Sequence, residues 1–412
     1  MKTNSSTTSS EEPATAAGWW VIFIITFATL LASIAALNWV IDPYDALGGI
    51  SLPGINEHKY SRVTGTAHFL ALAFGSYQGL LLGSSRAQNA LDPTHPGFGG
   101  RRVYNAALAG VSIGKLRTVF EYARSHNDLA QVVVALDFQM FDTGSGAGTP
   151  NDASWMPGAR EPGFAQVLLT ADVTRDSIRT LWGNLQGKPP DTVRGLITET
   201  NPVRLFYISE MEKSGYRTGI RNHLRSQLRA GWLKTYAYDP AQVDMLAAIV
   251  DESRRDGIDL RLLISPVHAL QLEAIYAAGH GKDFARWKRD LVRAAAARDG
   301  FPAVPLFDFT GWSGPTAEAV PEDGKRMRWY IEASHYTKDL GDRVLDRVLD
   351  HRDPHRASPR DFGVALSSDN IGQHLARMRE DRRRYRREFP EDVAAVEALV
   401  RSPGRLPPAR RR

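Results

Sequence analysis

The sequence predicts an α/β protein with a parallel sheet, preceded by one helix long enough to cross a membrane. Short apolar segments alternate with longer amphipathic segments, which is typical of strands and helices in a sheet covered on both faces. The clearest strand, Gln131 to Leu136, is apolar after its first residue, as expected for a strand buried on both sides. Trp19 to Ile41 contains no charged residue. These observations predict a three-layer architecture with an N-terminal membrane segment.

The composition allows a large core and excludes some kinds of chemistry. The chain has 412 residues, of which 43% are hydrophobic, and a net charge of +5, so we expect more than one domain or one domain with a large insertion. The chain has no cysteine, which excludes disulfides and zinc–thiolate sites. A Walker loop and a dinucleotide fingerprint after a strand are also absent. We therefore expect no cofactor, no metal and no nucleic-acid partner.

The N-terminal region predicts a membrane anchor. Residues 1–18 are rich in Ser, Thr and Ala, and we expect them to be disordered. As a helix, Trp19 to Ile41 is about 34 Å long, enough to cross a bilayer, and tryptophans stand at both of its ends. A cleaved signal peptide is the alternative, but Asp42-Pro43 follows rather than a small-residue cleavage site. We expect a single-pass protein of the inner (cytoplasmic) membrane with its main domain periplasmic or extracytoplasmic.

Residues 42–355 are predicted to form one α/β domain. Its first elements are helix Arg62–Phe74, strands Gly79–Leu82 and Arg102–Tyr104, helix Gly114–Ser125 and strand Gln131–Leu136. The later elements are helix Ala241–Arg255, strand Leu260–Ile264, helix Phe284–Arg298, strand Val304–Phe307 and helix Asp339–Leu349.

Two stretches depart from this alternation. An insertion at about 142–239 separates the third and fourth strands, opens with the flexible run Thr143–Gly148, and holds helical pieces with Trp182 and Trp232. It either covers a substrate site or packs as a subdomain. Residues 356–412 are predicted to be a basic helical and disordered tail. The tail helix at 373–389 is either solvated with i,i+4 ion pairs or bound to anionic lipid or an acidic polymer.

Three short motifs follow predicted strands in chain order. Gly83-Ser84-Ser85 follows the first strand, Asn105 to Gly110 follows the second, and Glu332 to His335 follows the fifth. Because ligands bind at the carboxyl ends of parallel strands, these motifs are expected at one edge of the sheet. Taken singly, each has a structural alternative: Ser84-Ser85 is then an ordinary helix N-cap, and His335 a helix-entry histidine.

In this order the motifs resemble those of the SGNH/GDSL hydrolase superfamily, over about Gly79 to Leu349 with the insertion unmatched. The resemblance implies a flavodoxin-like SGNH fold. It also implies Ser85 as the nucleophile, His335 as the base, Glu332 in place of the usual Asp as the acidic member, and Gly110 as an oxyanion donor. The chemistry agrees, because a serine hydroxyl attacks only when a base, oriented by a carboxylate, takes its proton.

The family's further oxyanion donor, an Asn after the third strand, has no identical counterpart here. Alignment of the third strand puts Gln139 at that position, and a Gln amide is also able to donate a hydrogen bond. Asn105 is a second candidate for the oxyanion site, or else supports the loop in which it lies. If neither residue donates, a non-catalytic role gains weight.

More closely, the chain resembles membrane-anchored members of that superfamily that serve O-acetylation of exported polysaccharides, such as the alginate acetylation proteins. More loosely, it resembles the D-alanyl transfer protein of teichoic acids. These resemblances imply a serine esterase or O-acetyltransferase that acts on an exported cell-surface polysaccharide through an acyl-serine intermediate. A multi-span acyltransferase is a candidate membrane partner. The alternative from another class is a non-catalytic polysaccharide-binding or assembly protein with an SGNH fold.

Other residues near the predicted strand ends are candidates for substrate contact. His268 follows the fourth strand, and we expect it either to touch substrate or to be a structural histidine. Trp329 precedes the His335 motif and is predicted either to form a sugar-facing wall or to pack in the core. Lys59, Arg62 and Arg86 are candidates for contact with an anionic sugar, with solvated surface as the alternative.

Overall fold

The structure is a computed structural model. It describes residues 16–45, 47, 50–60, 65–143, 168–229, 232–322, 325–356 and 362–401. Disorder was predicted for residues 1–18 and 405–412; all of these lie outside the described residues except 16–18, which belong to helix α1 (Ala16–Ile41). Positions 144–148 of the predicted flexible run also lie outside the described residues.

A six-stranded sheet forms the centre of the protein, in the order β2-β1-β3-β6-β7-β8. The first five of these strands are parallel, and β8 pairs antiparallel with β7. The predicted α/β class with a parallel sheet is therefore confirmed, whereas β8 was not predicted. The strands are β1 (Gly79–Leu82), β2 (Val103–Asn105), β3 (Gln131–Leu136), β6 (Asp259–Ile264), β7 (Leu306–Asp308) and β8 (Val364–Ala365).

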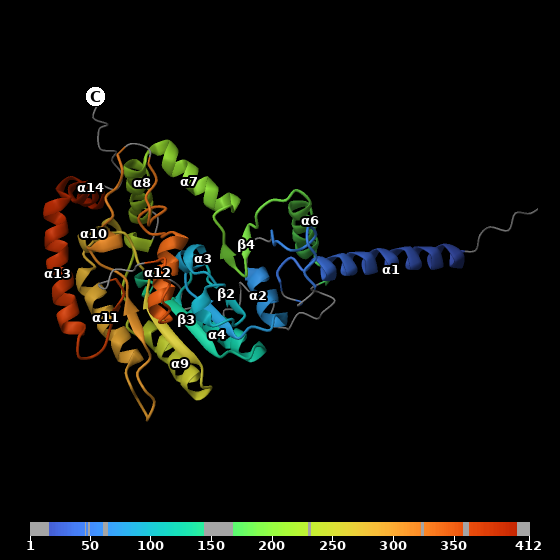
Figure 1. The fold of residues 1–412 in the computed structure, drawn as a ribbon, viewed down its shortest axis with the longest axis horizontal. Coiled ribbons are helices and arrows are strands. Elements are labelled where there is room, and N and C mark those ends of the chain that lie inside the picture. The colour runs from blue at the N-terminus through green and yellow to red at the C-terminus, as the bar shows by residue number, and fades with distance from the viewer. Residues whose placement is uncertain are drawn as a thin grey trace, which may run out of the picture.

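Helices cover both faces of this sheet (Figure 1). On one face α4 (Ile113–His126) packs against α9 (Gln242–Arg255), which packs against α11 (Gly281–Ala295); on the other, α3 (Ser85–Ala90) packs against α12 (Lys338–Val348). Right-handed crossovers explain why α3 lies on the opposite face from α4, α9 and α11, because the β1–β2 connection moves along the sheet in the opposite direction to the next three connections. The other helices of this body are α2 (Gly65–Phe74), α10 (Ala269–Ala277), α13 (Ile371–Glu388) and α14 (Pro390–Arg401).

The helix α4 shows how the sequence pattern sets such an element. Ser112 caps its N-terminus, with the side-chain oxygen accepting a hydrogen bond from the Lys115 backbone N–H at 3.3 Å. Apolar residues at helical spacing then form one face that packs against the sheet and its neighbours. The buried residues of that face include Leu116, Val119, Phe120 and Ala123.

The two ends of the insertion lie side by side at the main body. Its two ends pair through the backbone, Thr143 N–H to Ala237 C=O and Asp239 N–H to Phe141 C=O, both at 2.9 Å. In Figure 1 it extends from beside α1 across the upper side of the body. Its described elements are α6 (Ala171–Leu185), β4 (Thr192–Val193), β5 (Leu196–Ile197), α7 (Pro202–Ser214), α8 (Tyr216–Arg229) and the short helix Trp232–Lys234.

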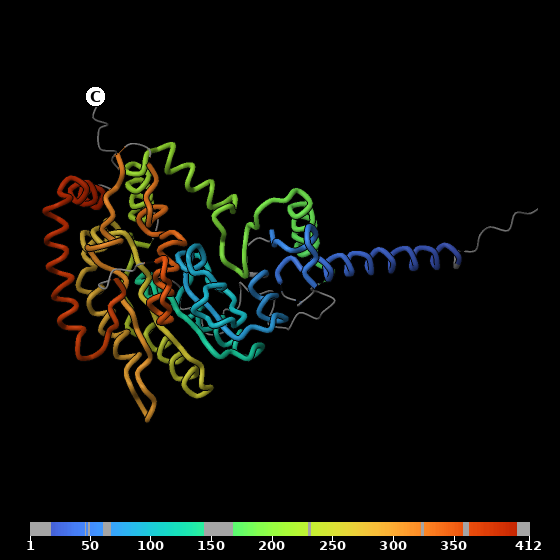
Figure 2. Tube along the Cα trace, in the orientation of Figure 1, coloured from blue at the N-terminus to red at the C-terminus, as the bar shows by residue number. Residues whose placement is uncertain are grey.

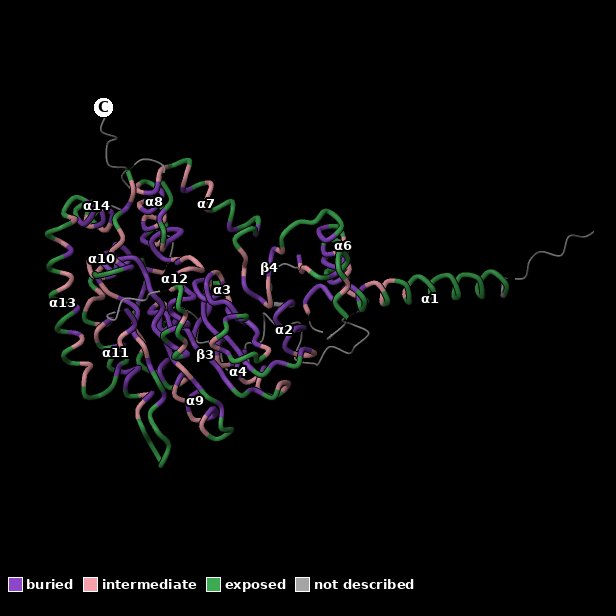
Figure 3. The backbone as a smooth tube through the Cα atoms, in the orientation of Figure 1, coloured by how far each residue is buried: buried purple, intermediate pink, exposed green. Residues whose placement is uncertain are grey.

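The N-terminal helix α1 (Ala16–Ile41) projects from the body, as the trace in Figure 2 shows. Most of its described length is exposed (Figure 3), and Gly18–Ile41 is long and apolar enough to cross a membrane. This exposed apolar helix fits a single-pass anchor or a signal sequence.

Residues 362–401 belong to the fold rather than to a separate tail. β8 extends the sheet beyond β7, and α14 packs against both α8 and α10. On α13, Arg382 and Arg386 each contact the buried carboxylate of Glu273 on α10, at distances of 2.8–2.9 Å. The predicted solvated tail helix is therefore wrong for this face, because two of its arginines neutralise a buried acid.

Candidate active site

Ser85 stands at the carboxyl end of β1. The strand ends at Leu82, and Gly83 then turns the chain where a Cβ would lie 2.6 Å from the Cβ of Ala87 and 3.0 Å from that of Ala135. Ser84 caps α3, accepting a hydrogen bond from the Arg86 backbone N–H at 3.2 Å. Ser85 is therefore the first residue of α3, and its N–H, like the others of a first helical turn, has no acceptor within the helix.

The structure brings together the three residues predicted as a catalytic triad. Ser85 Oγ lies 2.8 Å from His335 Nε2. The other ring nitrogen of His335, Nδ1, is in contact with Glu332 Oε1. A neutral imidazole with its hydrogen on Nδ1, facing the carboxylate, presents Nε2 as an acceptor for the Ser85 hydroxyl. This arrangement is able to activate a serine hydroxyl.

The loop that carries His335 is built around the Glu332 carboxylate. Glu332 is buried and accepts hydrogen bonds from the backbone N–H groups of Ser334 at 2.7 Å and His335 at 3.0 Å. Burial alone raises the pKa of Glu332, but the neighbouring His223 and His335 and these hydrogen bonds lower it more, so the net pKa lies well below its ordinary value. Glu332 is therefore ionised at neutral pH.

A second histidine contacts the same carboxylate, and the sequence analysis did not find it. His223, on α8 of the insertion, places Nε2 3.0 Å from Glu332 Oε2. Burial lowers the pKa of His223; the Glu332 charge raises it, and His335 and Arg86 lower it. The net lowering favours neutral His223 at pH 7. Nothing near His223 in the sequence marks it, because the contact joins segments more than a hundred residues apart.

Arg86 connects three segments of the site. Its NH1 lies 2.7 Å from Asp137 Oδ1 at the end of β3, and its Nε donates to the Ser334 carbonyl at 3.0 Å. Asp137 also accepts a hydrogen bond from the Ser84 hydroxyl. Arg86 is buried, so the predicted contact with an anionic sugar and the solvated alternative are both wrong for it. Its guanidinium instead ties the Ser85 turn to the His335 loop.

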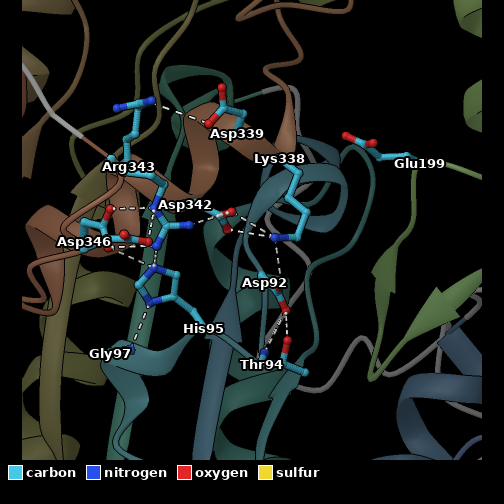
Figure 4. A network of polar contacts seen from close by, with 12 residues as sticks. Asp92, Thr94, His95, Gly97, Glu199, Lys338, Asp339, Asp342, Arg343 and Asp346 are labelled. Atoms are coloured by element: carbon cyan, nitrogen blue, oxygen red, sulfur yellow. Dashed lines mark hydrogen bonds and ion pairs between the residues drawn. The ribbon is translucent and has the colours of Figure 1, made fainter.

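A polar network on the same side holds α3 to α12 (Figure 4). Lys338, in the first turn of α12, contacts Asp92 at 2.8 Å and Asp342 at 2.9 Å. His95, in the loop after α3, contacts Asp346 at 3.1 Å. Asp92 and His95 follow the helix that begins with Ser85, and Lys338, the first residue of α12, follows His335 by three residues. The network therefore helps to fix the distance between the two sides of the site.

Two of the predicted oxyanion donors, Gly110 and Gln139, lie in separate segments of the chain. Gly110 is exposed and has a positive φ of 66°. Its loop is joined to the turn after β1, because the Leu108 N–H donates a hydrogen bond of 2.9 Å to the Gly83 carbonyl. Gln139 is half-buried in the short helix after β3 and, with Arg86, lines a cavity of about 20 Å³, which is room for one water molecule.

Asn105 is not available as an oxyanion donor. Its amide nitrogen donates to the carbonyls of Ala87 and Leu91, both at 2.9 Å, and its amide oxygen accepts from the Ala107 N–H at 3.1 Å. Both amide hydrogens are therefore used at the end of α3. This geometry matches the alternative in which Asn105 supports its loop.

The two predicted substrate-binding residues are engaged within the protein. His268 is buried, accepts the Leu270 N–H at its Nδ1, and places Nε2 2.7 Å from the Glu318 carbonyl; burial lowers its pKa to about 4. It is a structural histidine. Trp329 is half-buried, with the guanidinium groups of Arg328 and Arg343 at 4.3 and 5.0 Å from the ring centroid. A sugar would have to compete with these cations for the ring.

The insertion borders the site on several sides. The backbone of Arg194, in the β4–β5 turn, accepts the Asn105 N–H at 2.9 Å, and Arg204 on α7 donates to the Asn89 carbonyl on α3 at 2.8 Å. With His223 on α8, the insertion contacts the segments that carry each of the three motifs. Within the described part of the chain, no group of three or more His, Cys, Asp or Glu side chains is placed to hold a metal ion.

The sequence was also compared with known proteins. No protein-family model and no curated protein matches it, so the interpretation of the site rests on its own geometry.

Proposed function

We propose that this chain is a membrane-anchored serine acyl-ester enzyme of the SGNH type. The observation that carries the proposal is the Ser85–His335 contact of 2.8 Å together with the contact between His335 and Glu332. We propose an exported cell-surface polysaccharide as substrate, with O-acyl (acetyl) transfer or ester hydrolysis as the reaction.

In the proposed reaction, Ser85 Oγ attacks the carbonyl carbon of an acyl ester as its proton moves to His335 Nε2. Glu332 stabilises the imidazolium that forms. The backbone N–H groups of Ser85 and Gly110 are the proposed donors to the oxyanion. When the intermediate collapses, the leaving alkoxide takes the proton from His335, and the acyl group stays on Ser85. Water or a sugar hydroxyl then gives its proton to His335 and attacks the acyl carbon. The bond to Ser85 Oγ breaks, Ser85 takes the proton back from His335, and the acid or the acylated sugar is released.

The strand order supports the SGNH proposal. The first five strands run β2-β1-β3-β6-β7, the order of the flavodoxin-like doubly wound fold. The Ser85 turn follows β1, and the Asn105–Gly110 loop follows β2. The His335 loop lies between β7 and α12. These are the positions that the superfamily resemblance requires.

Contacts at the C-terminal end of α1 favour a retained membrane anchor rather than a cleaved signal peptide. Asn38, on α1, is buried, and its amide donates to the Leu168 carbonyl at 2.8 Å and to Thr174 Oγ1 at 2.9 Å. Cleavage after α1 would remove these contacts from the folded domain. We therefore propose an inner-membrane protein whose main domain is extracytoplasmic, where exported polysaccharides and an acyl-donating membrane partner are accessible.

A fluorophosphonate probe tests the proposal, because it reacts only with an activated serine. We expect labelling of the full-length protein, loss of labelling in Ser85→Ala, and retained labelling in Ser84→Ala. A melting curve for each variant shows that it is folded, which matters for Ser84 since it caps α3. Absence of labelling in the folded wild-type protein would favour the non-catalytic polysaccharide-binding alternative, for which the engaged side chain of Asn105 is the specific argument.

A further inference from the structure

The helix α6 is fixed against the C-terminal end of the apolar helix α1, where α1 joins the body. Asn38 of α1 contacts the Leu168 carbonyl and Thr174 at the start of α6. Just beyond α1, the Tyr44 hydroxyl donates to Asp176 of α6 at 2.9 Å. Figure 2 shows α6 lying across this end of α1. The position of α6 relative to α1 is thus set by buried polar contacts.

The side of α6 that faces away from the body carries an apolar stripe. Ile178, Trp182 and Leu185 lie at i, i+4 and i+7 and are 56%, 61% and 63% exposed, so they share one face of the helix. The opposite face packs inward through Val173 and Thr180. On a helical wheel the stripe adjoins the Thr174 side, which contacts α1. The stripe therefore continues the exposed apolar surface of α1.

Other exposed apolar side chains lie at the same place. Leu169 precedes α6 and is 40% exposed, and Ile50 is 80% exposed. The loop of Ile50 is held to α1 by Asn56, whose amide donates to the carbonyls of Val40 at 2.6 Å and Ile50 at 3.1 Å. Exposed apolar side chains from two separate segments, Leu169–Leu185 and the loop of Ile50, thus lie near the C-terminal end of α1.

The length of α1 puts this end at the surface of a bilayer. Gly18–Ile41 comprises 24 residues and rises about 36 Å, compared with a hydrocarbon core of roughly 30 Å. If the hydrocarbon core of the bilayer is centred on α1, Asn38 and the start of α6 lie at the boundary between acyl chains and head groups. An amphipathic helix with a Trp in its apolar stripe is suited to that layer.

We propose that α6 lies in the surface of the same phospholipid bilayer that α1 spans, with Ile178, Trp182 and Leu185 inserted among the lipids. The inference rests on α1 being a retained membrane span and does not depend on the reaction at Ser85. A second attachment beside α1 restrains rotation and tilt of the domain, so the Ser85 site is held at a defined height and orientation above the membrane.

Single-cysteine variants test this directly, because the chain has no cysteine of its own. Trp182→Cys and Leu185→Cys in the full-length protein are labelled with the environment-sensitive fluorophore NBD in phosphatidylcholine nanodiscs that hold one copy each. Phe27→Cys in α1 is the lipid-embedded control. Phe206→Cys on α7, where Phe206 is 60% exposed, is the matched exposed control.

We expect blue-shifted NBD emission at positions 182 and 185, and at least about twofold quenching by lipids brominated on their acyl chains, as for position 27. Position 206 should show water-like emission without this quenching. Water-like, unquenched emission at 182 and 185 would overturn the proposal. Blue-shifted emission that brominated lipid does not quench would also overturn it, since protein rather than lipid would then cover the stripe.

Discussion

At the scale of single residues, the Glu332 carboxylate is shared by two imidazoles. His335 contacts Oε1, and His223 lies 3.0 Å from Oε2. A carboxylate that orients a catalytic imidazole must itself be held in place, and buried carboxylates are costly unless each oxygen has a partner. If the chain has the proposed function, we expect His223 to be a positioning residue for Glu332, and through it for His335.

The His223 role leads to a prediction about kinetics. We expect His223→Ala to lower kcat for an aryl acetate by roughly tenfold with little change in KM, because Glu332 then has one restraint fewer while substrate contacts stay the same. His223→Gln should recover much of the loss, since its amide is able to donate to Glu332. Steady-state kinetics on the three proteins check this. Equal losses in both variants, or a change confined to KM, would contradict a positioning role.

At the scale of elements, the C-terminal helices are joined to the body by a buried acid. Glu273 on α10 is fully buried and receives Arg382 and Arg386 from α13. Removing one partner of a buried ion pair is costly, because the remaining charge has been taken out of water. This contact, with the α14 packing on α8 and α10, makes the basic segment a structural part of the domain.

The buried acid predicts a large effect for one arginine of α13 and a small effect for another. Arg382→Ala should lower the free energy of unfolding by roughly 3 kcal/mol, because the buried Glu273 carboxylate loses one of its partners. The loss is not larger because Arg386 still contacts Glu273. Arg384→Ala is the matched control: Arg384 is exposed and pairs with Asp381 on its own helix, so its loss should cost under about 1 kcal/mol. Urea unfolding followed by circular dichroism measures both. Similar midpoints for the two variants would contradict the structural role of the α13–α10 contact.

At the scale of the whole molecule, buried neutral histidines make the stability depend on pH, and His68 and His268 are two of them. Burial lowers the pKa of His68 and of His268 to about 4. In the unfolded chain both return to an ordinary value near 6.5. Between these values the unfolded state binds protons that the folded state does not bind, so stability rises with pH across this window.

We therefore predict that the free energy of unfolding is highest at and above about pH 7 and falls as the pH decreases from 6.5 toward 4. Each histidine contributes up to about 1.4 kcal/mol per pH unit in this range. His268→Gln should reduce the slope, whereas His355→Gln, at an exposed position, should leave it unchanged. Denaturant titrations between pH 7 and 4.5 measure the slope. A stability independent of pH over this range would contradict the prediction.

Features that depend on local patterns could be predicted from the amino-acid sequence alone. The strands Gly79–Leu82 and Gln131–Leu136 were predicted at the bounds of β1 and β3, because buried strands are short apolar runs that end at turn residues. The motifs around Ser85 and His335 were found in the same way, since a strand end, a glycine turn and a neighbouring carboxylate are all visible within a few residues. The helix α10 was missed because it is buried on all sides, with Gln271 and Glu273 among its buried residues, and so lacks an apolar stripe at helical spacing.

Which of the candidate residues meet, and which are already engaged, depends on the packing of distant segments. Asn105 and His268 stand at predicted strand ends, but their hydrogen-bonding groups are used by Ala87 and Glu318, from elements that the sequence does not place. His223 reaches Glu332, and Arg382 reaches Glu273, across more than a hundred residues each. A periodic pattern reports the burial of a residue, whereas its partner is set by how whole elements pack.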